Sequence, residues 1–276
     1  MTMRARLMLL LSALVMCFAA PVWAETRLLD RASVVAPHDG RVSDFLAVDI
    51  GAGTRCVLSG SDLTRRHAPW SSFKIPNFVI ALETGVATGP DHWRAWDPSL
   101  RPAAGFWPKS WRQGQTLETA LQRSVVWYFQ DIARDVGGSR YREILKRWSY
   151  GNAEAPDGDD GFWLYGPLAI SVEEQVAFVS ALLSGGIARS QDTLAALFAA
   201  TRDSEDKGRI IYGKTGSGPL EQGRAGAGFE GWYVGWVTRQ DRAPVAFAHY
   251  VRARTYADLR VFRRDQSLIL LEACGF

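Results

Sequence analysis

The stretch "PWSSFKIPNFVIALETG", residues 69–85, combines an apolar helix with a lysine in its first turn. Apolar side chains recur at spacings of three and four, and Gly85 is a typical helix end. Pro76 is tolerated because it falls in the first turn or so, where a backbone N–H needs no partner within the helix. The pattern predicts a buried helix with Lys74 among apolar side chains, three residues after Ser71.

Ser71 and Lys74 form a candidate nucleophile and base. Residues i and i+3 of a helix lie on one face, and a serine becomes nucleophilic when a neighbouring base removes its proton. Burial lowers the pKa of a lysine and so favours its uncharged form. A surface lysine that follows a serine by chance gives the same pattern, so this pair alone does not decide the function.

Two further polar sites stand out within structured segments. Lys214, in "YGKTGSG", is expected at the end of a strand, where the following glycine lets a ligand approach the backbone closely. A hairpin turn with an incidental lysine is the alternative. Ser124 interrupts an apolar helical run and could present its hydroxyl to a cleft, or could bond to its own backbone.

The chain places predicted strands at both ends and predicted helices between them. The residues around 86–112 are rich in proline, tryptophan and glycine and are expected to be a loop. The sequence thus predicts a mixed α/β (α+β) fold: one antiparallel sheet from about 25–65 and 205–276, with an all-helical lobe inserted at about 86–204. The predicted strands lie in 44–60, 208–218, 229–240 and 243–253, and the helices in 117–137 (with a break near Ser124), 139–151, 171–186 and the final residues.

Composition favours a globular protein without a nucleic-acid partner. The 276 residues are 47% hydrophobic and 22% charged, with 32 basic and 29 acidic side chains. Removing Arg4 and Arg6 from the start leaves 30 basic residues against 29 acidic ones. This near balance does not indicate binding to nucleic acid or to an anionic surface.

The first 24 residues are expected to be a cleavable signal peptide. Arg4 and Arg6 precede the apolar run "LMLLLSALVMCFAA", and Val22 and Ala24 occupy the −3 and −1 positions of a cleavage site. A retained membrane anchor is the alternative, although the run is short for a span. Met16 before Cys17 argues against a lipoprotein signal. We therefore expect a periplasmic protein of one domain, residues 25–276, with no membrane attachment after cleavage.

After cleavage two cysteines remain, Cys56 and Cys274. In an oxidising compartment they could form a disulfide, or they could be two separate buried thiols, and the sequence leaves both open. Two cysteines and four scattered histidines do not predict a zinc site, and no metal is expected. The histidines are His38, His67, His92 and His249.

The order of these motifs resembles one family. Ser-x-x-Lys, then Ser-x-Val, then Lys-Thr-Gly is the arrangement of penicillin-recognising serine enzymes. Together "SSFK", "SVV", "YGN" (Tyr150, Gly151, Asn152), "WLYG" and "KTGSG" resemble the class D (OXA-type) serine β-lactamases, from about residue 44 to the C-terminus. Class A enzymes have Ser-Asp-Asn in the middle motif, where this chain has Val126.

The resemblance implies a transpeptidase-like fold and a role for each motif residue. The family's lysine, here Lys74, is carbamylated by CO₂, which is the only small molecule required besides a β-lactam substrate. Trp163 would donate its indole N–H to the carbamate, and the apolar side chains of Val126 and Leu164 would exclude water around it. Ser124 would relay a proton. Backbone N–H groups of Ser71 and Ser217 would bind the oxyanion. Lys214, Thr215 and Gly216 would line the substrate's carboxylate side.

Several assignments at the edge of the site stay open. A family arginine also binds the carboxylate, and Arg260, Arg263 and Arg264 are the candidates; counting back from Gly275 favours Arg263. Trp111 and Trp70 are expected near the substrate, and Tyr165 could alter access to water. Oligomeric state and substrate spectrum are left open, the spectrum depending in part on the glycine-rich 219–228 loop.

Three other functions fit parts of the pattern. A β-lactam sensor domain shares these motifs but keeps the acyl group, and such domains usually follow transmembrane helices. A D,D-peptidase acting on cell-wall peptides and a family member without activity are the others. Because the motifs are intact, the sequence favours hydrolysis of β-lactams.

Overall fold

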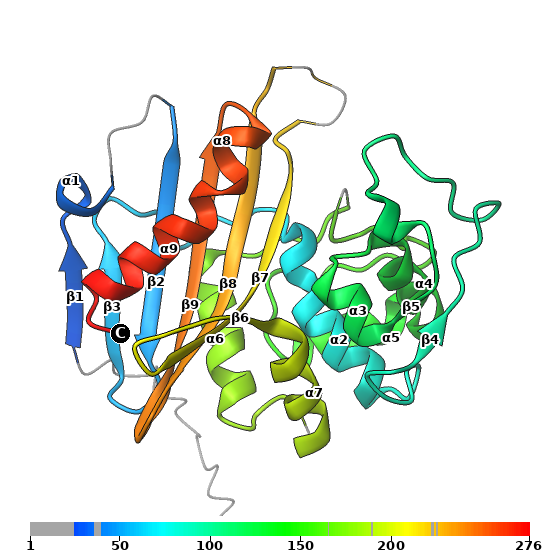
Figure 1. The fold of residues 1–276 in the computed structure, drawn as a ribbon, viewed down its shortest axis with the longest axis horizontal. Helices are drawn as coiled ribbons and strands as arrows, with labels where there is room; N and C mark the ends of the chain where they lie inside the picture. The colour runs from blue at the N-terminus through cyan, green and yellow to red at the C-terminus, as the bar shows by residue number, and fades with distance from the viewer. Residues whose placement is uncertain (1–24, 36–39, 165, 189, 222–223, 225) are drawn as a thin grey trace, which may run out of the picture.

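A computed structural model describes residues 25–35, 40–164, 166–188, 190–221, 224 and 226–276, so the predicted signal peptide lies outside the described residues. A seven-stranded sheet forms the left half of the molecule in Figure 1, in the order β1-β3-β2-β9-β8-β7-β6. Its strands are β1 (Glu25–Leu29), β2 (Val42–Asp49), β3 (Thr54–Leu58), β6 (Arg202–Asp206), β7 (Arg209–Pro219), β8 (Phe229–Arg239) and β9 (Arg242–Ala253). All neighbours are antiparallel except β1 and β3.

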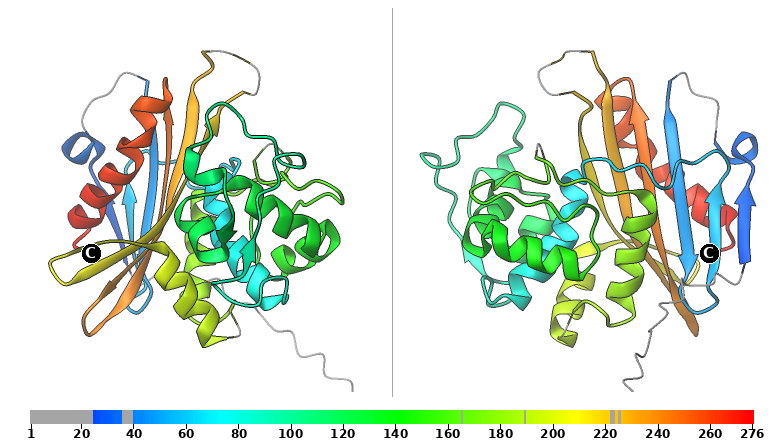
Figure 2. Two further views of the ribbon diagram at one scale, coloured as in Figure 1. Left: turned by 45° about the vertical axis from the view of Figure 1, so that its right-hand side comes forward. Right: turned by 180° about the vertical axis from the view of Figure 1, so that it is seen from behind.

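The helices form a lobe beside this sheet and a layer across its other face. The lobe contains η1 (Trp70–Phe73), α2 (Lys74–Glu83), η2 (Lys109–Trp111), α3 (Leu117–Gln122), α4 (Val126–Val136), α5 (Gly138–Arg147), α6 (Val172–Leu183) and α7 (Gln191–Thr201), with the small pair β4 (Trp93–Arg94) and β5 (Gln115–Thr116). On the opposite face lie α1 (Arg31–Val34), α8 (Tyr256–Arg260) and α9 (Phe262–Ala273). Figure 2 shows the sheet between the two groups of helices.

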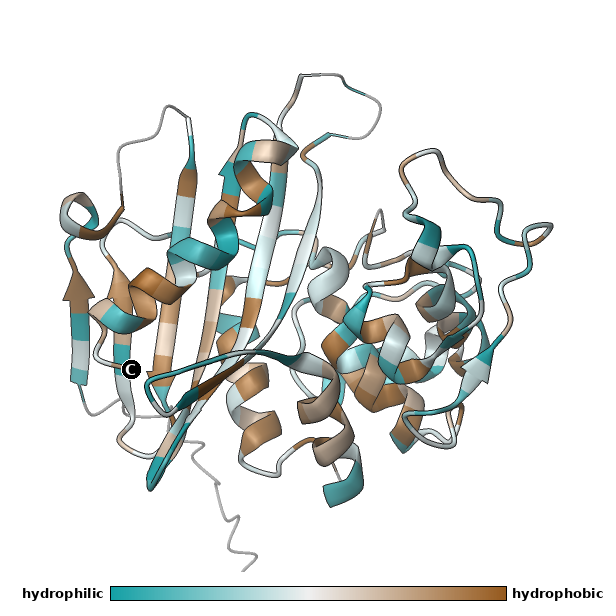
Figure 3. Ribbon diagram, in the orientation of Figure 1, coloured by the Kyte–Doolittle hydropathy of each residue, from teal (hydrophilic) through white to brown (hydrophobic). Residues whose placement is uncertain are grey.

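The strands bury both faces because their side chains alternate between two cores. Leu46, Trp232 and Ala248 belong to the core shared with the lobe, whereas Phe45 and Phe247 belong to a second core with α9. In Figure 3 hydrophobic residues alternate with paler ones along the central strands and recur along the helices of the lobe and α9. The predicted α/β fold, with strands from both ends of the chain around inserted helices, is confirmed. Two details of that prediction are wrong: the sheet is not wholly antiparallel, because β1 runs parallel to β3, and the lobe is not all-helical, because it contains the pair β4–β5.

Local predictions are confirmed where the sequence carries a stop or cap signal. The helical run 117–137 is broken at Ser124, whose φ of 59° ends α3 before α4 begins. Ser171 and Glu174 form the capping box that begins α6.

Three local expectations need correction. Ser71, the candidate nucleophile, lies in a short 3₁₀ turn, η1, rather than in the helix itself. The residues 86–112, expected to be loop throughout, contain β4 and η2. Beyond the helices named from the sequence, the structure adds α7, which runs directly into β6, and α8 before α9.

Cys56 and Cys274 form a disulfide. It joins β3 to the residue that follows α9, within the core on the α9 face. Of the two alternatives that the sequence left open, separate thiols is therefore wrong.

Within the part of the chain that the structure describes, every helix is too short or too polar to cross a bilayer.

Candidate active site

Ser71 and Lys74 are in direct contact at the junction of η1 and α2. Lys74 Nζ donates a hydrogen bond to Ser71 Oγ over 2.7 Å. Lys74 is completely buried, whereas Ser71 is partly exposed. The Phe129 ring of α4 lies beneath the amine, with its centroid 5.7 Å from Nζ. Ser71 is thus partly accessible to solvent, while the amine that contacts it is buried beside an aromatic ring.

The pocket changes the protonation of Lys74. Burial disfavours the ammonium form and holds the pKa of Lys74 well below its usual range, and the nearby charge of Lys214 lowers it further. The uncharged amine can accept a proton or attack an electrophile such as CO₂.

Trp163 packs beside the residue that precedes Lys74 and carries a donor without a partner among the described residues. Its ring stacks on Phe73, the residue before Lys74, with ring centroids 5.4 Å apart. Its indole N–H is buried and has no hydrogen-bond partner among the described residues. A buried donor without a partner costs free energy, so this N–H would gain from an acceptor close to it.

Strand β7 brings the Lys-Thr-Gly motif against η1. A Cβ on Gly216 would lie 3.0 Å from the Ser71 nitrogen and 2.8 Å from the Ser72 nitrogen, so only glycine allows this approach. Strand β6 pairs with β7 no further than Tyr212, which leaves the following residues paired with β8 alone among the described strands. Backbone groups of Thr215 to Ser217 are therefore available near the nucleophile.

Lys214 is the second buried amine. Its Nζ donates to the Thr215 carbonyl oxygen over 2.9 Å. Burial lowers the pKa of Lys214 to about 7, helped by the charge of Arg263. Lys214 and Arg263 are thus neighbouring cationic groups that would gain from an anion between them.

Arg263 is the best placed of the three candidate arginines. It is buried on α9, and its Nε and Nη1 atoms have no hydrogen-bond partner among the described residues. Arg264 is instead paired with Asp203 at 2.8 Å, and Arg260 is exposed. The structure therefore places a guanidinium beside Lys214 at position 263.

The α3–α4 connection supplies the middle motif. Ser124 has the left-handed backbone that turns the chain into α4, where Val126 is the first residue and is partly buried. Trp111 lies alongside, because its indole N–H donates to the Arg123 carbonyl oxygen over 2.8 Å. Leu164 is buried next to Trp163, while Tyr165 and parts of the 219–228 loop lie outside the described residues.

The Tyr-Gly-Asn motif braces the segment that carries Trp163. Asn152 donates to the Pro167 carbonyl oxygen over 2.7 Å and accepts from the Ala169 N–H over 3.0 Å. Gly151 has a φ of 56°, and a Cβ there would lie 2.2 Å from the Ala169 carbonyl oxygen. Tyr150 is buried and donates weakly to Gln175 over 3.5 Å.

Two polar contacts near the nucleophile were not predicted from the sequence. Gln175 donates to Ser72 Oγ over 3.0 Å and so joins α6 to η1. Glu230 of β8 is buried and accepts the Trp70 indole N–H over 2.8 Å. The only available sequence signal was a carboxylate in the otherwise apolar stretch "FEGWYVGWV".

No cluster of three or more histidine, cysteine or acidic side chains suited to a metal occurs among the described residues.

Comparison with known proteins identifies the family. The profile of the penicillin binding protein transpeptidase domain matches residues 57–195. β-Lactamase OXA-5 of Pseudomonas aeruginosa is 36% identical over 198 residues, covering 68% of this chain and 71% of that protein. The chain belongs to the class D β-lactamase family. β-Lactamase OXA-10 of the same species is 36% identical over 178 residues. This match covers 64% of this chain and 64% of OXA-10, which is just under two thirds of the length of that protein.

Structures in this family and in a related receptor are similar over most of the chain. A class D β-lactamase from Nostoc has a TM-score of 0.76 and 27% identity, covering 86% of this chain and 95% of that one. The C-terminal domain of the BlaR penicillin receptor of Bacillus licheniformis has a TM-score of 0.77 and 26% identity, covering 91% and 96%. Class D β-lactamases and this receptor domain thus share one fold with the chain.

Proposed function

We propose that the protein hydrolyses the amide bond of β-lactams through an acyl-enzyme on Ser71. The observation that carries the proposal is the 2.7 Å contact between Ser71 Oγ and the buried amine of Lys74, whose pKa burial holds well below its usual range. Membership of the class D family supports it independently.

Substrate binding uses the two cations beside β7. Lys214 and Arg263 would receive the substrate carboxylate, with the Thr215 hydroxyl as a further donor. The carboxylate would restore the charge of Lys214, whose pKa burial lowers to about 7.

Acylation begins with attack of Ser71 Oγ on the lactam carbonyl. Its proton passes to position 74, and backbone N–H groups of Ser71 and Ser217 stabilise the oxyanion. One such donor typically lowers the activation barrier by about 3–4 kcal/mol. The C–N bond then breaks, and Ser124 relays a proton to the leaving nitrogen.

Deacylation needs a base that activates water, and the side chain at position 74 would be that base. Addition of CO₂ to the uncharged Lys74 amine, with release of a proton, would supply an anionic carbamate. Trp163 would donate its unpartnered indole N–H to that group, and Val126 and Leu164 would exclude bulk water around it. Water then loses a proton at position 74 and attacks the ester, and Ser71 is released with its hydroxyl restored.

A β-lactam sensor is the second candidate. Regulatory protein BlaR1 of Bacillus licheniformis is 32% identical over 185 residues, covering 67% of this chain and 29% of that protein. In such a role Ser71 would be acylated but not released.

The test is to mix the purified protein with a chromogenic cephalosporin, with and without added bicarbonate. Many turnovers per molecule, stimulated by bicarbonate, are expected. One equivalent of product followed by arrest would favour the sensor, and no product at all would contradict both functions.

We also propose export to the periplasm with cleavage after Ala24. Mass spectrometry of protein secreted by a Gram-negative host is expected to give Glu25 as the first residue. An intact apolar segment in the membrane fraction would contradict this proposal and support the anchor.

A further inference from the structure

Trp70, the residue directly before Ser71, has a strained backbone. Its φ is 51°, in the left-handed region that a bulky L-residue rarely adopts. Such a conformation costs about 1–3 kcal/mol and persists only where the surroundings enforce it. Trp70 is the first residue of η1 and directly precedes Ser71, so its backbone conformation affects where Ser71 lies.

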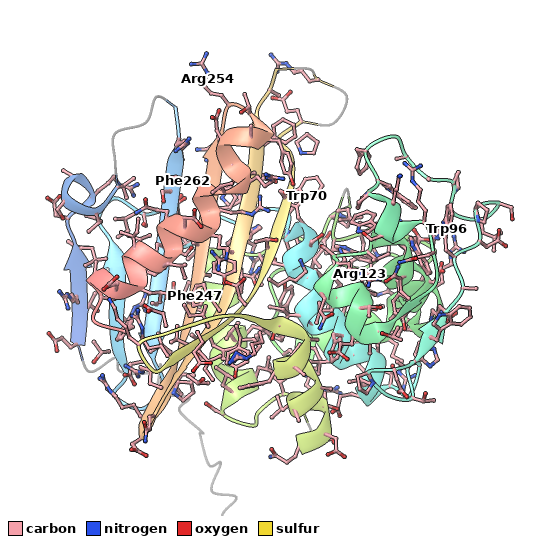
Figure 4. The ribbon with its side chains drawn as sticks, viewed as in Figure 1. Trp70, Trp96, Arg123, Phe247, Arg254 and Phe262 are labelled. Atoms are coloured by element: carbon pink, nitrogen blue, oxygen red, sulfur yellow. A yellow bond between two sulfur atoms is a disulfide. The ribbon has the colours of Figure 1, made fainter. Side chains whose placement is uncertain are left out.

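Three contacts hold Trp70 in place. Its backbone N–H donates to the Trp163 carbonyl oxygen over 3.1 Å. Its indole N–H donates to Glu230 Oε1 over 2.8 Å. Its ring covers Gly218 of β7 so closely that a Cβ there would lie 2.1 Å from a ring atom. Figure 4 shows Trp70 at the junction between the sheet and the helical lobe.

Glu230 is itself fixed by the sheet. Its second oxygen accepts from the Tyr250 hydroxyl over 2.7 Å and faces His67 Nδ1 at 3.6 Å. His67 stacks on Tyr250, with ring centroids 3.8 Å apart. Burial alone would raise the pKa of Glu230, but the nearby His67 and the hydrogen bonds from Tyr250 and Trp70 outweigh it and lower the pKa. The carboxylate is thus an ionised, buried anchor.

The anchor has no contact with Lys74 or Lys214 of the proposed mechanism. An apolar pair of similar volume would fill this space without the cost of burying a charge. A buried carboxylate adds direction instead, because its two oxygens accept from donors on different elements: Trp70 on η1 and Tyr250 on β9.

We propose that Glu230 and Trp70 are positioning residues that fix the Ser71 hydroxyl and backbone N–H against β7 for acylation. The inference rests on the proposed function and adds to it two residues outside the family motifs. Loss of the Trp70–Glu230 hydrogen bond would let Trp70 relax toward ordinary φ and move the Ser71 N–H relative to Gly216. Misplacement on the ångström scale reduces a rate by about 100-fold.

The test compares single-turnover acylation rates by stopped-flow mixing with a chromogenic cephalosporin. Trp70→Phe keeps a ring over Gly218 but removes the donor, and Glu230→Leu removes the acceptor. Both are expected to acylate at least about tenfold more slowly. Glu230→Gln keeps an acceptor for the indole and is expected to remain within about threefold of the unaltered protein.

Trp236→Phe is the matched control. Trp236 is also fully buried, and its indole N–H has no partner among the described residues, so the same substitution removes no hydrogen bond. Its melting temperature shows how much stability the exchange of a buried tryptophan costs without altering Ser71. Its acylation rate is expected to stay unchanged.

The outcomes separate the two proposals. Unaltered acylation in folded Trp70→Phe, or equal losses in Glu230→Gln and Glu230→Leu, overturns the positioning role while hydrolysis by the unaltered protein still stands. If Trp70→Phe does not fold, the comparison of Glu230→Gln with Glu230→Leu decides. Absence of an acyl adduct on the unaltered protein in intact-mass spectra contradicts the proposed function and the inference with it.

Discussion

Lys74 is the residue whose environment departs most from what its side chain normally requires. An ammonium group in an apolar pocket is unfavourable. Burial therefore lowers the pKa of the amine and favours its uncharged form. Trp163, whose ring stacks on Phe73, has a buried indole N–H with no partner among the described residues. This N–H is the donor that the proposed function assigns to a carbamate on Lys74.

Replacement of Lys74 by alanine tests its role as proton acceptor. We expect Lys74→Ala to lose both acylation and release, by at least about 100-fold, because Ser71 keeps its proton. Intact-mass spectrometry after exposure to a penicillin measures the adduct. Rapid formation and decay of an adduct in this variant would show that another base acts on Ser71.

Replacement of Trp163 by phenylalanine tests the donor. The acyl-enzyme is expected to accumulate in Trp163→Phe, because the anionic base loses its only proposed hydrogen-bond donor. Trp236→Phe, which alters an equally buried and unpartnered indole, is expected to show no trapped adduct. Equal behaviour of the two variants in intact-mass spectra would contradict the assignment of Trp163.

At the scale of elements, the segment between α5 and α6 positions Trp163. Its conformation depends on Asn152, which bonds to both Pro167 and Ala169. The Tyr-Gly-Asn motif, recognised from the sequence only as a family signature, is thus a brace for this segment.

We therefore expect Asn152→Ala to slow deacylation more than acylation. The substitution leaves η1 and β7 unaltered but removes both side-chain hydrogen bonds from Asn152 to 167–169. Stability should fall by about 1–3 kcal/mol, because each lost hydrogen bond contributes about 0.5–1.5 kcal/mol. Burst and steady-state phases with a chromogenic substrate separate the two steps. A loss confined to acylation would show that the brace acts on the nucleophile instead.

The ends of helices and strands could be predicted where the sequence carries a local break or cap signal. The break at Ser124 and the cap at Ser171 follow from polar residues within apolar periodicity. In contrast, α7 passes into β6 between Thr201 and Arg202 with no glycine or proline to mark the change. The Trp70–Glu230 hydrogen bond joins residues 160 positions apart, so no local sequence pattern could predict it.

At the scale of the whole molecule, the two ends of the chain are locked together beside the lobe. Strand β2 pairs with β9, and the disulfide joins Cys56 to Cys274 across 218 positions of sequence. The fold could be predicted because the proposed chemistry needs particular residue types in each motif, and the order of these motifs along the chain resembles one family. The disulfide could not be predicted, because pairing depends on the packing of α9 against β3.

We expect the double variant Cys56→Ala/Cys274→Ala to be less stable by about 2–5 kcal/mol, since a long closed loop restricts the unfolded chain. Urea unfolding measures the free energy of unfolding, and catalytic rates should not change because Cys274 follows the end of α9, whereas Arg263 lies at the start of that helix. A stability equal to that of the unaltered protein would mean that the disulfide adds nothing beyond packing.

The central claim is that the pocket converts the amine of Lys74 into a CO₂-bound proton acceptor. Carbon-13 NMR of the folded protein in labelled bicarbonate tests it directly. We predict one carbamate resonance, absent from Lys74→Ala, that declines as the pH falls because protonation of the amine removes the form that binds CO₂. The depressed pKa of Lys74 places that loss well below the usual lysine range. No resonance from the folded protein even at alkaline pH would contradict the account.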